Sequence, residues 1–182
     1  MTAVFSAHNK AILYQARDTF ILSLISLTVP LAVHAIPVFG DMPAGLRLLP
    51  LFYAPFIAAM LSKPQVGLSV AVLAPVLNSM ITGLPRQDQV VSITLELALF
   101  VLLVVLCRRI RGVRWGIAPI CFIVMKILLC LFGWTQSNAP YGAFLDEFLR
   151  TSAVSAPGIF MLLLINILLA HYEKKESGIA GH

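Results

Sequence analysis

Charged residues are scarce in this chain. Only 12% of its 182 residues are Asp, Glu, Lys or Arg, whereas 59% are hydrophobic, and the mean hydropathy is +0.93. A soluble domain keeps roughly a quarter of its residues charged. Half that fraction leaves too little polar surface to cover a body in water. The composition therefore predicts that most apolar side chains face lipid.

Motifs for catalysis and for metal binding are also lacking. The chain has no GxxxxGK[ST] phosphate-binding loop, no HExxH and no GxSxG, so we expect neither an enzyme nor ATP hydrolysis by this chain alone. Its cysteines, Cys107, Cys121 and Cys130, are odd in number and have no metal-ligand spacing, so we expect no metal and no other cofactor. The net charge of +5 does not indicate a nucleic-acid partner, because Lys and Arg are divided among several short segments.

The long stretches between charges predict transmembrane helices. A spanning helix needs about 20 apolar residues, and five stretches with at most one charge reach that length. A sixth, shorter stretch becomes a tilted span when it is extended back to Leu46. The predicted spans are residues 19–39, 46–62, 65–83, 89–107, 115–134 and 152–172. Because no segments of alternating polarity appear, we expect an all-α integral membrane protein, a compact bundle of six transmembrane helices in a single domain.

The distribution of Lys and Arg predicts the orientation. With the N-terminus in the cytoplasm, nine of these residues fall in inner segments and three, Arg47, Arg86 and Arg150, in outer ones. Cytoplasmic segments carry such an excess, so both termini are expected in the cytoplasm of a bacterial cell, with the bundle in its plasma (inner) membrane. The first stretch is long and starts late, which favours a retained helix over a cleaved signal peptide.

Three segments outside the spans have their own patterns. Residues 1–18 mix apolar and basic side chains, which predicts either an amphipathic segment on the inner membrane surface or a frayed tail. Residues 173–182 are expected to be a polar cytoplasmic tail. The aromatic outer loop 135–150 either closes over a cavity or lies in the interface as part of an aromatic belt.

Two ionisable residues fall inside predicted spans. Glu96 lies seven residues from the outer end of the fourth span, and Lys126 lies eight residues from that of the fifth, or roughly 10 and 12 Å deep. Opposite charges at matching depth on consecutive helices predict an ion pair. Such groups normally face the bundle interior or a wet cavity. The pair either binds a ligand or only neutralises itself and holds the two helices together.

Three further polar residues are expected at a similar depth in other spans, namely His34, Tyr53 and Asn78. Taken singly, each is more often a packing residue than a ligand contact. Together with Glu96 and Lys126 they predict one outward-facing substrate site in the outer half of the bundle. Asn166 is expected near the inner end of the sixth span, away from that site.

The middle of the chain resembles the substrate-binding (S) components of energy-coupling factor (ECF) transporters. The similar residues are PLFYAPFIAAMLS at 50–62, KPQVGLSVAVLAPVLNSMITGLPRQDQVVSITLELALF at 63–100, and SAPGIFMLLLINILLA at 155–170. The resemblance implies a six-helix bundle that captures a vitamin-like small molecule at its outer face. A transmembrane coupling protein and two cytoplasmic ATPases would power release. Glu96 matches the acid of the family's fourth helix, and Lys126 stands where a basic residue is expected in the fifth.

Two other classes of protein are compatible with the same pattern. A six-helix scaffold of the rod-shape-determining kind would have an apolar interior and only a structural use for Glu96 and Lys126. A small membrane enzyme or flippase-like protein would need a reactive group at the membrane interface.

Overall fold

The computed structural model describes residues 2–34, 47–110, 115–132 and 144–179. In these ranges the chain forms seven α-helices and no β-strand. The helices are α1 (Thr2–His34), α3 (Pro50–Leu61), α4 (Pro64–Thr82), α5 (Gln87–Cys107), α6 (Ile117–Leu131), α7 (Phe144–Val154) and α8 (Ala156–Ile179).

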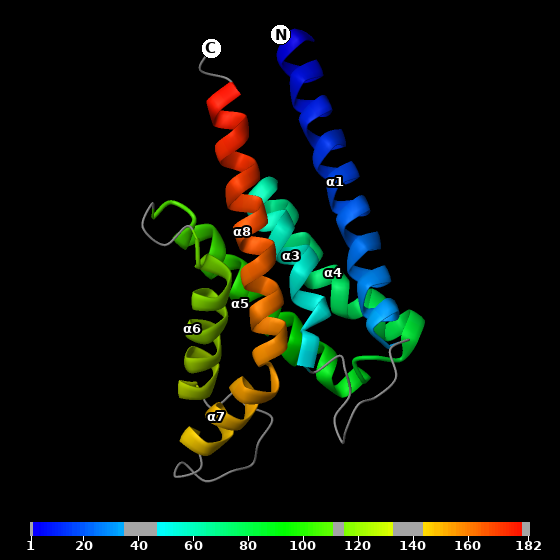
Figure 1. Ribbon diagram of the computed structural model, residues 1–182. Coiled ribbons are helices and arrows are strands. Elements are labelled where there is room, and N and C mark those ends of the chain that lie inside the picture. The colour runs from blue at the N-terminus through cyan, green and yellow to red at the C-terminus, as the bar shows by residue number, and fades with distance from the viewer. Residues whose placement is uncertain (1, 35–46, 111–114, 133–143, 180–182) are drawn as a thin grey trace.

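The helices run up and down in a bundle whose two chain ends lie at the same end (Figure 1). We call this the termini end, and the opposite one, where α7 lies, the α7 end. The short α3 is central, since it packs against α1, α4, α5 and α8. The helices α5 and α6, which carry the two residues of the predicted ion pair, pack directly against one another.

Three helical segments are long and apolar enough to cross a membrane, namely Ile12–Val33, Pro64–Thr82 and Gln87–Cys107. A fourth crossing is possible if Phe148–Val154 and Ala156–Tyr172, which meet at a bend of 61°, act as one broken span. The chain is thus a helical protein with several membrane-spanning candidates. Each of the six predicted spans contains a helix, but Pro50–Leu61 and Ile117–Leu131 are shorter than a full crossing.

The N-terminal residues differ from the expected separate segment. The helix α1 continues without a break from Thr2 to His34, so residues 2–18 are helical and lead directly into the first span. Part of the predicted outer loop is also helical, since α7 begins at Phe144. Residues 135–143 of that loop lie outside the described residues.

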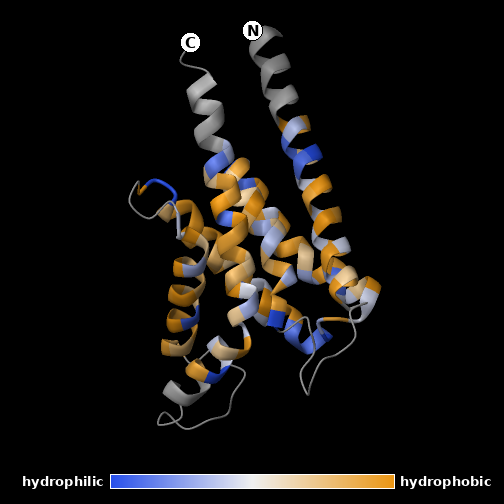
Figure 2. Cartoon of the chain, viewed as in Figure 1, coloured by the Kyte–Doolittle hydropathy of each residue, from blue (hydrophilic) through white to orange (hydrophobic). Residues whose placement is uncertain are grey.

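Hydrophobic residues occur along all the helices (Figure 2), and many of the large ones are exposed. In α1 the large residues Phe20, Ile21 and Leu24 are exposed, whereas the small polar residues Ser23 and Ser26 are buried. This is the reverse of a helix in a water-soluble protein. It follows if the outer face of α1 contacts lipid and its small residues allow close packing on α3 and α4.

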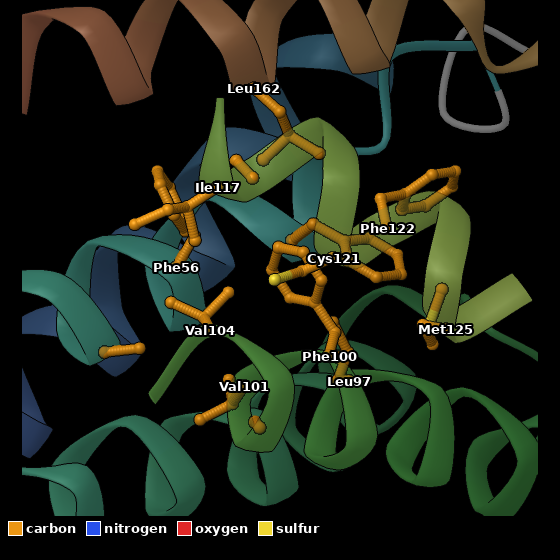
Figure 3. Close-up of a cluster of buried hydrophobic side chains, with 14 of the residues drawn as sticks. Phe56, Leu97, Phe100, Val101, Val104, Ile117, Cys121, Phe122, Met125 and Leu162 are labelled. Carbon is orange, nitrogen blue, oxygen red and sulfur yellow. The ribbon is translucent and has the colours of Figure 1, made fainter. Parts of the chain in front are cut away.

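A cluster of aromatic rings packs in the core of the bundle. Phe52 of α3 packs edge-on against Phe100 of α5 and Phe122 of α6, with ring centroids 5.3 Å apart in both pairs. All three rings are buried. Figure 3 shows Phe100 and Phe122 among the neighbouring buried side chains of α5 and α6, including Leu97 and Met125. We call Phe52, Phe100 and Phe122 the aromatic floor.

Arg108 joins two helix ends at the termini end of the bundle. Its Nη1 donates to the carbonyl oxygen of Ala59 at 2.7 Å and to that of Ser62 at 3.4 Å. Ala59 is in the last turn of α3 and Ser62 is its C-cap residue, where the helix has no further N–H groups to satisfy the carbonyls. A cation also interacts favourably with the negative end of the α3 dipole, so Arg108 ties the end of α5 to the end of α3.

Two glycines mark places where helices approach closely. A Cβ on Gly158 of α8 would lie 2.8 Å from the carbonyl oxygen of Arg47 and equally close to Leu48. A Cβ on Gly67 of α4 would lie 3.2 Å from the backbone of Ala59. Glycine therefore allows the chain entering α3 to lie against α8, and α4 to lie against α3.

Candidate functional site

Glu96 of α5 and Lys126 of α6 form an ion pair, as the sequence predicted. Lys126 Nζ donates to Glu96 Oε2 at 2.9 Å, and both side chains are 19% exposed. Helix periodicity explains the contact, since each residue lies beside the buried face through which α5 and α6 pack. The pair is therefore mostly buried, with a small exposed fraction on each side chain.

The ion pair lies one helical turn from the aromatic floor, on the side nearer the α7 end. Glu96 precedes Phe100 by four residues, and Lys126 follows Phe122 by four, so in both helices the charged residue is one turn nearer the α7 end. The ammonium of Lys126 also lies 5.8 Å from the centroid of the Phe122 ring, within range of a cation–π interaction. Phe100 and Phe122 thus lie one turn nearer the termini end than the two charges.

Ser92 adds a third polar group on the same face of α5. It lies four residues before Glu96, one turn further toward the α7 end. Its Oγ is buried and has no hydrogen-bond partner among the described residues. A buried hydroxyl without a partner costs about 1–3 kcal/mol, so this position has unused hydrogen-bonding capacity. Serine is common in membrane helices, so no feature of the sequence distinguishes Ser92 as a site residue.

Asn78 of α4 makes a side-chain hydrogen bond that joins α4 to α1. Its Nδ2 donates to the carbonyl oxygen of Ser26 at 3.0 Å and to that of Ala74 at 2.8 Å. Pro30, four residues after Ser26, has no N–H to bond that carbonyl within α1. Asn78 supplies the missing donor from the neighbouring helix. Its Oδ1 is buried without a partner among the described residues.

Tyr53 stabilises the entrance to α3. Its hydroxyl donates to the carbonyl oxygen of Leu48, five residues earlier. The next residue, Leu49, has a φ of 51°, in the left-handed region that a branched side chain seldom adopts. The Tyr53 contact, together with the close approach of Gly158, holds this turn in place.

His34 is the last residue of α1, which places its backbone at the α7 end. Its side chain lies outside the described residues, so its contacts with the other predicted site residues stay a prediction.

Asn166 lies in a different part of the bundle, near the start of α6. Its Oδ1 accepts a hydrogen bond from the backbone N–H of Ala118 at 3.3 Å. Ala118 is in the first turn of α6, where backbone N–H groups have no partner within the helix. Asn166 of α8 therefore caps α6 from the side, and it is separate from the ion pair.

The structure thus joins two of the five predicted site residues, Glu96 and Lys126, by a direct contact. Asn78 and Tyr53 make their described hydrogen bonds to backbone carbonyls instead. Within the described ranges, no three His, Cys, Asp or Glu side chains are grouped to hold a metal ion.

Comparison of the chain with protein-family models, with curated protein sequences and with solved structures gives no match.

Proposed function

We propose that this chain is the substrate-capture subunit of an ECF-type importer in the bacterial plasma membrane. It binds a vitamin-like small molecule between α5 and α6, in the half of the bundle nearer the α7 end. The observation that supports this most is the mostly buried Glu96–Lys126 ion pair, one helical turn from the aromatic floor. Apolar residues of similar volume would stabilise a bundle at least as well as a desolvated ion pair, which favours a use of these charges beyond stability.

In this proposal the chain is not an enzyme and works with separate partners. It has no phosphate-binding loop, so a transmembrane coupling protein and two cytoplasmic ATPases supply the energy. The buried rings of Phe100 and Phe122 follow the ion pair along α5 and α6 in the direction of the termini end. Release of the molecule toward the cytoplasm therefore requires a rearrangement of the bundle, which the partners drive.

The proposal requires six crossings, with the termini end in the cytoplasm and the α7 end outside. An impermeant thiol reagent applied to intact cells tests this orientation with cysteines at two exposed positions. Asp88→Cys, at the α7 end of α5, is expected to react, and Ile110→Cys, just beyond its other end, is expected to be protected. The unmodified chain corrects for Cys107, Cys121 and Cys130. Reaction of the cysteine at 110 with protection of the one at 88 would reverse the orientation.

Retention of a small molecule tests the capture function itself. Protein purified in mild detergent is denatured, and the released molecules are identified by mass spectrometry. The double variant Glu96→Leu/Lys126→Leu removes both charges without leaving one unpaired, and it is expected to lose the molecule while keeping its helical fold. The control Arg86→Leu/Asp88→Leu removes an exposed ion pair, 3.4 Å long, from the same end of the bundle. It is expected to retain the molecule.

A second function, a six-helix scaffold of the rod-shape-determining kind, is favoured by the contacts of the other polar residues. Asn78 and Asn166 each join two helices, and Tyr53 stabilises a turn. A scaffold needs the ion pair only to join α5 to α6. In that case the purified protein releases no small molecule, and the Leu/Leu variant is as active in the cell as the unmodified chain.

A further inference from the structure

The Glu96–Lys126 contact leaves hydrogen-bonding capacity on both side chains. A carboxylate has two acceptor oxygens and an ammonium has three donors, and their 2.9 Å contact uses one of each. A molecule that donates to Glu96 and accepts from Lys126 can therefore bind without breaking the pair. This step rests on the capture function proposed above and concerns the chemistry of the captured molecule.

Charge balance restricts that molecule further. Glu96 and Lys126 neutralise one another in a part of the bundle that is only 19% exposed at each side chain. An anion or cation bound there would leave one net charge in a low-dielectric environment, which is strongly unfavourable. A molecule with no net charge avoids this cost and still satisfies both partners.

Ser92 extends the same face of α5 by one turn. From the aromatic floor toward the α7 end, α5 presents Phe100, Glu96 and Ser92 at intervals of four residues, or about 6 Å along the axis. The Oγ of Ser92 is buried and unpartnered in the described part of the chain. It can donate or accept, so it provides a third contact for a molecule already held by Glu96 and Lys126.

We propose that Glu96, Lys126 and Ser92 select an electrically neutral molecule that carries a hydrogen-bond donor beside an acceptor. Amides, lactams, ureas and zwitterionic amino acids have this arrangement. The donor binds the carboxylate of Glu96, the acceptor binds the ammonium of Lys126, and a further polar atom binds the hydroxyl of Ser92. Apolar parts of the molecule rest on the aromatic floor.

The test exposes the purified protein to a deproteinised bacterial extract, which offers neutral, anionic and cationic small molecules together. After washing, the retained molecules are released and identified by mass spectrometry, and the affinity of each is then measured by calorimetry. The unmodified chain is expected to retain a neutral donor–acceptor molecule. Ser92→Ala is expected to bind that molecule about tenfold more weakly, as is usual for the loss of one buried hydrogen bond. The control Ser69→Ala, on the exposed face of α4, is expected to bind it unchanged.

The variant Glu96→Gln adds a change of selectivity that a purely structural role would not produce. It leaves Lys126 as the one charge, so retention is expected to shift from neutral molecules to anions. If this variant does not fold, the charge of the molecule retained by the unmodified chain is the measurement that tests the inference.

Retention of an anion or a cation by the unmodified chain overturns this inference and leaves the capture function intact. Retention of a neutral molecule with equal affinity for the chain and for Ser92→Ala removes Ser92 from the site. Retention of no molecule at all by folded protein overturns the capture function and, with it, the inference.

Discussion

The two ends of the bundle use their polar residues in opposite ways. At the termini end, the guanidinium of Arg108 bonds the carbonyls that close α3, and Gly67 lets α4 lie against α3. Toward the α7 end, Glu96 and Lys126 bond one another, and buried polar atoms of Ser26, Asn78 and Ser92 lack partners among the described residues.

The satisfied polar contacts contribute to stability, whereas the unsatisfied polar atoms provide capacity to bind a molecule. A satisfied polar contact between backbone ends holds helices together, whereas unsatisfied buried polar atoms cost stability and serve a protein only if something binds them. The termini end therefore has the features of a structural base. The half of the bundle nearer the α7 end is where we propose that a molecule binds. Four sets of variants test this division, from the largest expected effect to the smallest.

Removing one member of the ion pair is expected to have the largest effect. Glu96→Ala leaves an ammonium without its partner inside the bundle, and its expected cost is about 3–5 kcal/mol in the free energy of unfolding. The double variant Glu96→Ala/Lys126→Ala is expected to cost less than the sum of the single effects. Denaturation by SDS in mixed micelles measures all three values. Strict additivity would show that the 2.9 Å contact contributes nothing.

At the termini end, Arg108→Ala removes a charged donor from the two carbonyls of α3. The expected loss is about 1.5–3 kcal/mol, the usual range for hydrogen bonds to a charged group. The neighbouring Arg109 is exposed, so Arg109→Ala is the matched control and is expected to be nearly neutral. Equal effects of the two substitutions would remove Arg108 from the structural base.

Asn78→Ala tests whether the amide replaces the N–H that Pro30 lacks. In the unmodified background the substitution leaves the carbonyl of Ser26 without its donor from α4, at an expected cost of about 2 kcal/mol. In a Pro30→Ala background the restored N–H bonds that carbonyl within α1, so the same substitution is expected to cost less than about 1 kcal/mol. An equal cost in both backgrounds would show that the two residues act independently.

Gly158→Ala tests the close approach between α8 and the residues that precede α3. The added methyl would meet the backbone of Arg47 and Leu48 at 2.8 Å, so the expected cost is about 1–2 kcal/mol. Gly116→Ala is the control, because its methyl would lie 3.6 Å from the flexible end of Ile120. A destabilisation no larger than that of the control would indicate that the turn before α3 shifts freely.

Several features could be predicted from the sequence because they depend on local composition. Apolar length predicted a helix in each expected span, and the charges at matching depth predicted the contact of Glu96 with Lys126. The same method did not predict that Asn78 and Tyr53 make hydrogen bonds to backbone carbonyls. Depth along a helix places a residue at a level in the bundle, but the direction in which its side chain points depends on helix rotation and packing.

The short helix α3 shows the limit most clearly. Apolar residues that face lipid and apolar residues that face other helices look alike in a sequence, so nothing in residues 50–61 marks that helix as central. Its burial follows from its contacts with four other helices. Likewise, the donor for the Ser26 carbonyl comes from Asn78, 52 residues away, and the acceptor for Arg108 lies 49 residues back at Ala59.

The sequence by itself thus determined that the chain is helical, that its helices are apolar enough for a membrane, and that two opposite charges share one depth within it. These properties follow from the length, hydropathy and charge of short segments. Only the tertiary structure decided which helix is central, which polar groups are satisfied, and that the aromatic floor lies one helical turn from the ion pair. Those properties depend on contacts between residues far apart in the chain, and such contacts form only when the helices pack together.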